Sequence, residues 1–407
     1  MANHTITAVK GFRAAAIHCG IKTTAKPDLA VLVSDVPATA AAVFTTNKVV
    51  GAPVIVGRRH MAKHTLRACV INSGCANVCT GERGVADAFE MCRLVAESLV
   101  AEGGELPLSQ ILPASTGVIG HFLPMDKIRA GIPKVMARLS VSQVAGNAFA
   151  EGILTTDLVK KTAYEAVTIG GQRVTIAGCC KGSGMIAPNM ATMLAYVATD
   201  VAMASGVLQK LVSETSTQTF NCVTVDQHTS TSDTLAVLAN GLAGNRKIAS
   251  TGGQGARAFA EALYAVCDSL AQQIARDGEG ATKLVTVRVT GAASASDAKR
   301  AAEAIANSAL CKTAIHGGDP NWGRFVSAAG YSGAAMNPDQ SLCKVGAIQV
   351  FKNGRPTNAD LKKVQSVMQQ KDVAITVDLG TPGKHEHRVY TCDLSREYIR
   401  INADYHT

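Results

Sequence analysis

Short runs of branched apolar residues recur along the chain, and they set the strongest limit on its fold. Each run is rich in valine and isoleucine and is bounded by turn residues, which is the pattern of buried β-strands. The runs are LAVLVS (29–34), RACVIN (67–72), VTIAG (174–178), LVTVRV (284–289) and VAITVDL (373–379). We therefore expect strands distributed over most of the chain.

Helical patterns lie between these runs. Apolar residues follow three-and-four spacing over 85–100 and, more strongly, over 255–277, which predicts amphipathic helices. A further helix is expected over 296–310, with Ser296 as its N-cap, and the glycine-rich GGQGARA is expected to be the loop that leads into the helix over 255–277. At 407 residues the chain exceeds what one hydrophobic core usually serves. The predicted fold class is mixed α/β, in two parts or two closely packed halves.

The net charge of +9 invites comparison with nucleic-acid-binding proteins. The basic residues are scattered, in pairs such as Arg58-Arg59, Lys160-Lys161 and Lys362-Lys363, and the chain has one tryptophan. Nucleic-acid binding needs a clustered basic face with aromatic residues for stacking. We expect a solvated surface and no nucleic-acid partner, and nucleic-acid binding remains only a remote alternative.

Twelve cysteines in a chain of this length do not predict a disulfide framework. The first twenty residues lack the apolar core of a signal peptide, and no apolar run is long enough for a membrane span. We expect a cytoplasmic protein with buried thiols and no membrane partner. No metal site is expected, because Cys75 and Cys79 lack a second pair of ligands and His385 and His387 lack a third. GKHEH is predicted to be a solvated turn.

The segment KGSGMIAPNMAT (181–192) ends a series of turn residues at Thr192, directly before the apolar MLAYVA. Thr192 can simply cap the following helix or strand. Alternatively, cleavage after Ala191 would free the α-amine of Thr192, which could then serve as the base for its own hydroxyl. The segments PASTGVIG (113–120) and NSGCANVCTGERG (72–84) are expected to be loops whose backbone N–H groups could face an anion.

The segment KGSGMIAPNMATML resembles the self-cleavage motif of the glutamate N-acetyltransferase and ornithine acetyltransferase family of arginine biosynthesis. The resemblance extends over nearly the whole chain, in the order of the family's signatures. The matching segments are KPDLAVLVSDVPATAAAVFTTNKV (26–49), LPASTGVIG (112–120), GILTTD (152–157), RDGEGATK (276–283), DPNWGRF (319–325) and INADYHT (401–407).

The resemblance implies a layered two-part fold of the ornithine acetyltransferase type, processed into an alpha chain, 1–191, and a beta chain, 192–407. Cleavage between Ala191 and Thr192 would make Thr192 the nucleophile, with Thr116 and Gly117 as the oxyanion hole. The implied substrate contacts are Thr155 (favoured over Thr156), Lys181, Thr192, Glu279, Asn402 and Thr407. Chemistry adds that Lys181 suits the substrate's α-carboxylate and Glu279 suits the ammonium of ornithine.

The implied reaction transfers an acetyl group from N-acetylornithine to glutamate through an acyl-threonine, by a ping-pong mechanism. No cofactor is implied; acetyl-CoA is a possible second acetyl donor, which would make the enzyme bifunctional. The implied assembly is a heterotetramer of two alpha and two beta chains. The alternative enzyme class is a self-processing amidase or aminopeptidase, in which water accepts the acyl group. The chain departs from the family pattern at Cys75, Gln227 and His228, which bears on substrate preference rather than on reaction class.

Overall fold

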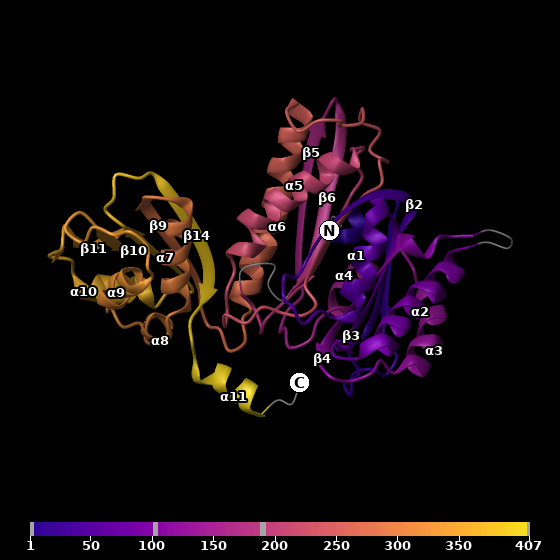
Figure 1. Cartoon of the computed structure of the whole chain (residues 1–407), viewed down its shortest axis with the longest axis horizontal. Helices are drawn as coiled ribbons and strands as arrows, with labels where there is room; N and C mark the ends of the chain where they lie inside the picture. Colours follow the sequence, from indigo (N-terminus) through magenta and orange to yellow (C-terminus); the bar gives the residue numbers. More distant parts are fainter. Residues whose placement is uncertain (1–3, 101–104, 188–192, 405–407) are drawn as a thin grey trace.

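A computed structural model gives the structure of the chain and describes residues 4–100, 105–187 and 193–404 (Figure 1). Two β-sheets organise it, one built from the first two thirds of the chain and the other from the last third. Helices lie on the outer sides of the first sheet and beside the second, so the architecture is layered and mixed α/β, as expected.

The first sheet has the strand order β4-β3-β2-β8-β7-β6-β5, with β1 paired to β2. The β3–β4 and β7–β8 pairs are parallel and the other pairs are antiparallel. The strands are β1 (Phe12–Ile17), β2 (Leu29–Phe44), β3 (Thr65–Cys75), β4 (Ile111–Val118), β5 (Lys161–Ile169), β6 (Gln172–Lys181), β7 (Leu194–Thr199) and β8 (Thr234–Ala239).

Both faces of the first sheet are buried. Along β7, Ala195 and Val197 face one cluster while Leu194 and Tyr196 face another, as the two-residue period of a strand requires. Helices α5 and α6 pack on one outer flank, and α2 and α3 pack on the other (Figure 1). The helices of this part are α1 (Ala52–His60), α2 (Gly81–Leu99), α3 (Met125–Met136), α4 (Gln143–Gly152), α5 (Ser205–Gln218) and α6 (Gln254–Arg276).

The second sheet, with strand order β12-β11-β10-β13-β9-β14, has its own hydrophobic core. Its strands are β9 (Leu284–Ala292), β10 (Leu342–Val345), β11 (Ile348–Lys352), β12 (Arg355–Pro356), β13 (Asp372–Asp378) and β14 (His385–Cys392). The helices of this part are α7 (Ala295–Asn307), α8 (Ala309–Gly317), α9 (Gly323–Tyr331), α10 (Leu361–Met368) and the C-terminal α11 (Arg396–Asp404).

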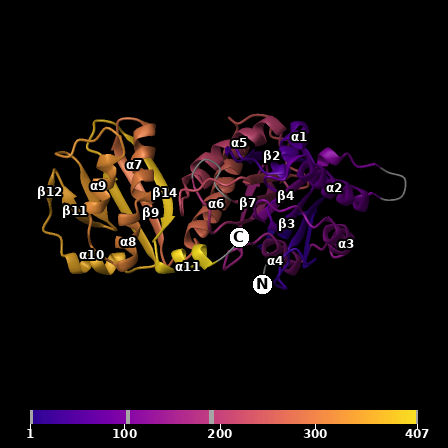
Figure 2. The same cartoon turned by 60° about the horizontal axis from the view of Figure 1, so that its bottom comes forward.

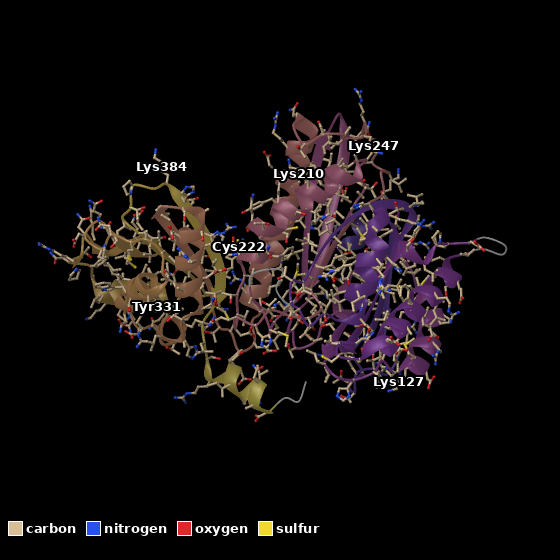
Figure 3. The ribbon with its side chains drawn as sticks, viewed as in Figure 1. Lys127, Lys210, Cys222, Lys247, Tyr331 and Lys384 are labelled. Carbon is tan, nitrogen blue, oxygen red and sulfur yellow. The ribbon has the colours of Figure 1, made fainter. Side chains whose placement is uncertain are left out.

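Helix α6 joins the two sheets through polar contacts with β14. Asp268 on α6 accepts a hydrogen bond from Arg388 at 2.7 Å and one from the Tyr390 hydroxyl at 3.1 Å. Cys222 lies in the same region between the two parts (Figure 3), with its Sγ 3.9 Å from Nε2 of His387 on β14. Helix α11 then leaves the second sheet and extends back toward the first part (Figures 1 and 2).

Most of the elements expected from the sequence are confirmed. The five apolar runs correspond to β2, β3, β6, β9 and β13, with Leu379 just beyond the end of β13. The three amphipathic patterns correspond to α2, α6 and α7, but the pattern over 296–310 extends past the end of α7 at Asn307 into α8. The expected cap at Ser296 is wrong. Ser294 caps α7 instead, its Oγ accepting a hydrogen bond from the Asp297 amide at 3.0 Å.

The expected turn at GKHEH is also wrong, because β14 begins at His385, where it pairs with Ala292 of β9. Exposed polar residues at this sheet edge hid the strand from the sequence pattern. The twelve cysteines, all within the described residues, are free thiols. They are buried as expected, except that Cys19 is partly exposed and Cys79 is exposed.

Candidate active site

Thr116 and Gly117, the residues expected to form an oxyanion hole, lie at the carboxyl end of β4. There β4 runs parallel to β3, with Thr116 opposite Ser73 and Gly117 opposite Gly74. The expectation that 113–120 and 72–84 are loops is therefore wrong for 113–118 and for 72–75, because strand pairing extends through these residues. Small side chains made these strands look like loops in the sequence.

The two strands approach so closely here that Gly117 is not replaceable without movement. Gly117 has φ +132°, and a Cβ on it would lie 2.4 Å from the carbonyl carbon of Gly74. Gly74 also has positive φ, +107°, and the register shifts between it and Cys75. Such an irregularity interrupts the regular ladder and re-aims backbone groups. This end of β3 and β4 is suited to presenting an N–H group to an anionic oxygen.

The TTD segment is anchored by a buried ion pair that joins three parts of the chain. Lys161 Nζ lies 2.6 Å from Oδ1 of Asp157 and 2.6 Å from Oδ2 of Asp277, and the Lys161 and Asp157 side chains are fully buried. Asp157 also accepts hydrogen bonds from the Gly182 amide at 2.7 Å and the Thr155 amide at 3.1 Å. The network therefore fixes the TTD segment against the residue that follows Lys181.

In this network burial disfavours the charged forms of Asp157 and Lys161, and the attraction between opposite charges outweighs that effect. Burial alone would raise the pKa of Asp157, but Lys161 and Lys181 hold that pKa below its usual range. Burial alone would lower the pKa of Lys161, but Asp157 and Asp277 raise it. Lys161 was expected to lie on the solvated surface with Lys160, and for Lys161 this is wrong. Lysines such as Lys127, Lys210, Lys247 and Lys384, by contrast, are spread around the periphery (Figure 3).

Lys181 ends β6, and only 5% of it is exposed. Burial lowers the pKa of its ammonium, while the carboxylates of Asp157, Asp233 and Glu279 act in the opposite direction. In the antiparallel β6–β7 pair Lys181 lies opposite Leu194. Lys181 is therefore close to Leu194 at the start of β7, and Leu194 lies two residues after position 192 in the sequence.

Glu279 is brought to this site by the segment that follows α6. Its amide donates to the Ser183 carbonyl at 3.0 Å, which holds it beside the loop after Lys181. Gly184 of that loop makes room for the carboxylate, because a Cβ there would lie 2.4 Å from both carboxylate oxygens. The Asn402 amide of α11 donates to Glu279 Oε2 at 2.9 Å. The structure thus places Asn402 of the C-terminal helix at Glu279.

Lys22 borders the same region and was not anticipated from the sequence. If Gly74 carried a Cβ, that atom would lie 3.1 Å from Cγ of Lys22. Gly74 is the residue that pairs with Gly117. Burial lowers the pKa of Lys22 to about 8, and the charges of Asp157 and Lys181 act on it as well. Lys22 is thus a link between the β3–β4 end and the Lys181 cluster.

Two further carboxylates, the partly buried Asp226 and the buried Asp233, support the loops of the site. Asp226 accepts hydrogen bonds from the amides of Met185 and Ile186, at 2.7 and 2.8 Å. Asp233 accepts one from the Met193 amide at 2.9 Å. In the sequence Asp226 follows Val225, and Asp233 stands between Ser232 and Thr234. Neither context separates a structural carboxylate from a functional one.

The remaining expected residues lie outside the part of the chain that the structure describes: Ala191, Thr192 and Thr407. The described residues bring together Lys181, Glu279 and Asn402, with the TTD segment joined to them through Asp157. The preference for Thr155 over Thr156 stays a prediction. Within the described residues, no group of three or more His, Cys, Asp or Glu side chains is arranged to hold a metal ion.

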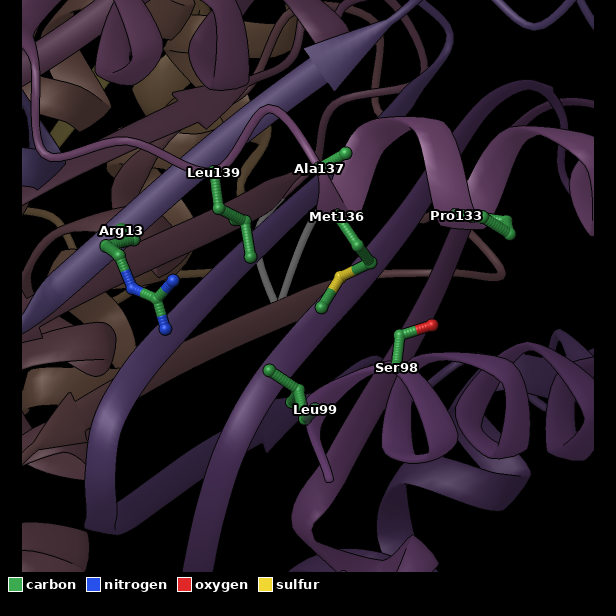
Figure 4. Close-up of a pocket in the computed structure, with 7 residues that line it drawn as sticks. All are labelled: Arg13, Ser98, Leu99, Pro133, Met136, Ala137 and Leu139. Carbon is green, nitrogen blue, oxygen red and sulfur yellow. The ribbon is translucent and has the colours of Figure 1, made fainter. Parts of the chain in front are cut away.

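A surface pocket of about 420 Å³ lies elsewhere (Figure 4). It lies between the end of α2 and the end of α3, and Arg13 is part of its lining. Arg13 and Thr116 lie at opposite ends of the first sheet, so the pocket is far from the candidate site. Arg13 forms an ion pair with Asp35 at 2.7 Å. The rest of the lining is Ser98, Leu99, Pro133, Met136, Ala137 and Leu139, which offers no acid–base or nucleophilic pair.

Comparison with known proteins agrees with the resemblance read from the motifs. The model of the ArgJ family matches residues 13–407. "Arginine biosynthesis bifunctional protein ArgJ" of Geobacillus kaustophilus is 44% identical over 100% of this chain and 97% of its own length. The protein of the same name from Symbiobacterium thermophilum is 48% identical over 99% of this chain and 98% of its own.

Among solved structures, the ornithine acetyltransferase of Mycobacterium tuberculosis, complexed with ornithine, is 37% identical. The match covers 46% of this chain and 96% of the Mycobacterium tuberculosis chain, with a TM-score of 0.41. The family match and the full-length relatives make the chain an enzyme of the acyltransferase class. It belongs to the ArgJ family. Of the helices that the structure describes, none combines the length and apolarity needed to cross a membrane.

Proposed function

We propose that the chain transfers the acetyl group of N-acetylornithine to glutamate, giving ornithine and N-acetylglutamate, with Thr192 as the nucleophile. One observation carries the proposal beyond family membership. A buried cation, Lys181, and a carboxylate, Glu279, occupy one site, where they suit the α-carboxylate and the ammonium of an amino-acid substrate. Asn402 holds Glu279 from the C-terminal helix.

The nucleophile arises from the chain itself. In the proposed cleavage, the Thr192 hydroxyl attacks the Ala191 carbonyl carbon, the bond to the Thr192 nitrogen breaks, and water hydrolyses the resulting ester. The products are chains 1–191 and 192–407, and the new α-amine is the base for the hydroxyl. The two chains would remain associated without a disulfide, since β6 of the first pairs with β7 of the second and β2 pairs with β8.

Transfer then follows in two half-reactions. The Thr192 oxygen attacks the acetyl carbonyl of N-acetylornithine, its proton passes through the α-amine to the departing ornithine nitrogen, and an acetyl-threonine ester remains. The α-amine of glutamate attacks the ester, forming N-acetylglutamate and restoring the hydroxyl. The Thr116 hydroxyl and the Gly117 N–H would stabilise the oxyanion in both steps. Thr155 and Thr407 complete the proposed substrate contacts.

The wider proposal includes acetyl-CoA as a second acetyl donor and no cofactor. A heterotetramer of two alpha and two beta chains follows from the family resemblance alone. A cytoplasmic location is supported by the free thiols of the twelve cysteines, which suit a reducing compartment. Incubation with acetyl-CoA and glutamate as the only substrates tests the second donor: formation of N-acetylglutamate supports it, and its absence restricts the enzyme to recycling acetyl groups.

The test of the main reaction uses N-acetylornithine with a deuterated acetyl group. With glutamate present, the label should appear in N-acetylglutamate. Without glutamate, ¹⁵N-labelled ornithine should exchange into N-acetylornithine, because the ping-pong cycle is reversible at the acyl-enzyme. Thr192→Ala is the matched control and should do neither. Release of the label as acetate at the same rate with and without glutamate would instead identify a hydrolase.

A further inference from the structure

Lys22 and Lys181 are two ammonium groups of the candidate site for which the fold supplies no carboxylate partner. Lys181 is 5% exposed and Lys22 is partly buried. Among the residues that the structure describes, neither lysine forms an ion pair, whereas the neighbouring Lys161 lies 2.6 Å from oxygens of both Asp157 and Asp277. Charged groups inside proteins are normally paired. Two cations without a carboxylate partner in one site therefore indicate an anionic ligand.

Carboxylates whose charges act on the two lysines are engaged by other donors. Asp157 accepts hydrogen bonds from Lys161 and from the Gly182 amide, at 2.6 and 2.7 Å. Glu279 accepts one from the Asn402 side-chain amide at 2.9 Å. These carboxylates are thus committed to holding the loops of the site together.

A buried aspartate fixes the loop that carries Lys22. Asp28, which is fully buried, accepts hydrogen bonds from four consecutive backbone amides at 2.7 to 3.1 Å, those of Cys19, Gly20, Ile21 and Lys22. The Asp28 carbonyl accepts the Ser73 amide at 2.9 Å, which joins the loop to β3. The position of the Lys22 backbone is therefore set by the fold and does not depend on a ligand.

The Lys22 side chain lies at the end of the β3–β4 pair. Its Cγ packs at Gly74, where an added Cβ would lie 3.1 Å away, and Gly74 pairs with Gly117. Its Nζ donates to the Pro27 carbonyl at 2.8 Å. An ammonium group has three N–H donors. In the described part of the chain Pro27 is the acceptor for one of them, so two donors remain for a ligand.

Contacts through Pro27 connect Lys22 with Lys181. A Cβ on Gly152 would lie 3.8 Å from Pro27 Cβ, so Pro27 lies beside the first residue of GILTTD. Asp157, the last residue of that segment, accepts the amide that follows Lys181. Burial lowers the pKa of Lys22 to about 8, and the positive charge of Lys181 acts in the same direction. An anion bound by both ammonium groups would offset their repulsion.

The proposed substrates differ in the number of their carboxylates. N-acetylornithine has one, the α-carboxylate, which suits Lys181, and its side-chain ammonium suits Glu279. Glutamate has a second carboxylate on its side chain, which Glu279 would repel. Both substrates use one site in a ping-pong cycle, so the site needs a separate cation for the second carboxylate. Lys22 is such a cation.

We infer that Lys22 donates a hydrogen bond to the side-chain carboxylate of glutamate while Lys181 binds its α-carboxylate. Together the two lysines select a dicarboxylic amino acid as the acetyl acceptor. The inference rests on the proposed function, since it assumes that glutamate is the acceptor. Lys22 is a specificity residue, because the group that it binds is present in glutamate and absent from ornithine.

The test compares Lys22→Met with Lys26→Met in the full-length protein. Methionine keeps an unbranched side chain against Gly74 but removes the charge, and Lys26 is an exposed lysine of the same segment. Each variant takes acetyl groups from N-acetylornithine and passes them either to glutamate or to ¹⁵N-labelled ornithine. The value of kcat/KM is measured for both acceptors, and thermal unfolding checks that each variant is folded.

Loss of a hydrogen bond to a charged group should lower kcat/KM for glutamate roughly 10- to 150-fold relative to ornithine in Lys22→Met. Lys26→Met should keep the wild-type ratio between the two acceptors. If Lys22→Met loses as much activity with ornithine as with glutamate, or loses none with glutamate, the inference is overturned. A wild-type protein that forms no N-acetylglutamate from N-acetylornithine and glutamate would instead overturn the proposed function, so the two failures are distinguishable.

A crystal structure of the wild-type protein with glutamate tests the contact without any variant, should Lys22→Met not fold. The side-chain carboxylate of glutamate should lie within hydrogen-bond distance of Lys22 Nζ. A side-chain carboxylate that is bound by other residues alone overturns the inference.

Discussion

Gly184→Ala tests whether Glu279 binds substrate, because the added methyl group acts on that carboxylate first. A Cβ at position 184 would lie 2.4 Å from the Glu279 carboxyl carbon and from each of its oxygens. The Glu279 backbone is held by Ser183, at 3.0 Å, so the side chain must move. Its 2.9 Å hydrogen bond from Asn402 would then be lost.

The expected cost follows from the bond that the substrate loses. A hydrogen bond to a charged group contributes about 1.5–3 kcal/mol. Loss of the contact between Glu279 and the substrate ammonium should therefore weaken binding roughly 10- to 150-fold. The effect should appear in KM for N-acetylornithine. Oxyanion stabilisation at Thr116 and Gly117 remains, and so kcat should change less than KM.

Steady-state kinetics with N-acetylornithine and saturating glutamate provides the assay, with thermal unfolding as the check on folding. The matched control is Gly206→Ala on α5, where an added Cβ meets nothing within 4 Å. This control should keep the wild-type KM. A folded Gly184→Ala protein whose KM stays within twofold of the wild type would show that Glu279 does not contact the substrate.

Three further predictions concern other parts of the site. Thr116→Val should lower kcat roughly 10²- to 10³-fold, as the loss of one oxyanion donor does, and unchanged turnover in a stopped assay would make Thr116 a packing residue. Deletion of 403–407 should leave cleavage intact but raise KM and the share of acetate over N-acetylglutamate, since the proposed substrate contact at Thr407 implies a tail that excludes water from the ester. An unchanged product ratio with unchanged KM would contradict this. Lys161→Met should lower the free energy of unfolding in urea by about 3–5 kcal/mol, since it leaves Asp157 buried and unpaired. The pKa of Asp157 is lowered and that of Lys161 is raised in the folded protein, so the stabilisation by the pair should be lost as pH falls below about 3.9 or rises above about 10.4. If the difference in the free energy of unfolding between the wild type and Lys161→Met does not change with pH in those ranges, the assignment is contradicted.

The sequence predicts β2, β3, β6, β9 and β13 from their runs of branched apolar residues, and it predicts the helices with a strong apolar stripe. It does not predict β14, because that strand begins with the exposed His385 and Glu386 and is defined by its pairing with β9. It misplaces the end of β4 as a loop, because Ser115, Thr116 and Gly117 are small and polar, whereas a parallel partner strand holds them extended.

The site shows the same division between local and long-range information. Family motifs point to Lys181, Glu279 and Asn402, and the fold brings these three together. Lys161 could not be recognised, since a lysine that follows another lysine is usually solvated, and Asp277, its partner across the fold, is more than a hundred residues away in the sequence. Asp233 depends on the same kind of contact, with Met193 on the neighbouring strand. Partners distant in sequence decide which charges are buried.

The most direct test of the account is the intact mass of the purified protein under denaturing conditions. The central claim is that Thr192 becomes a nucleophile through cleavage after Ala191. It predicts two species, residues 1–191 and 192–407, whose masses sum to that of the 42.2 kDa chain plus one water. Thr192→Ala should give one uncut and inactive species. A wild-type protein that is a single full-length chain and still transfers acetyl groups would contradict the account.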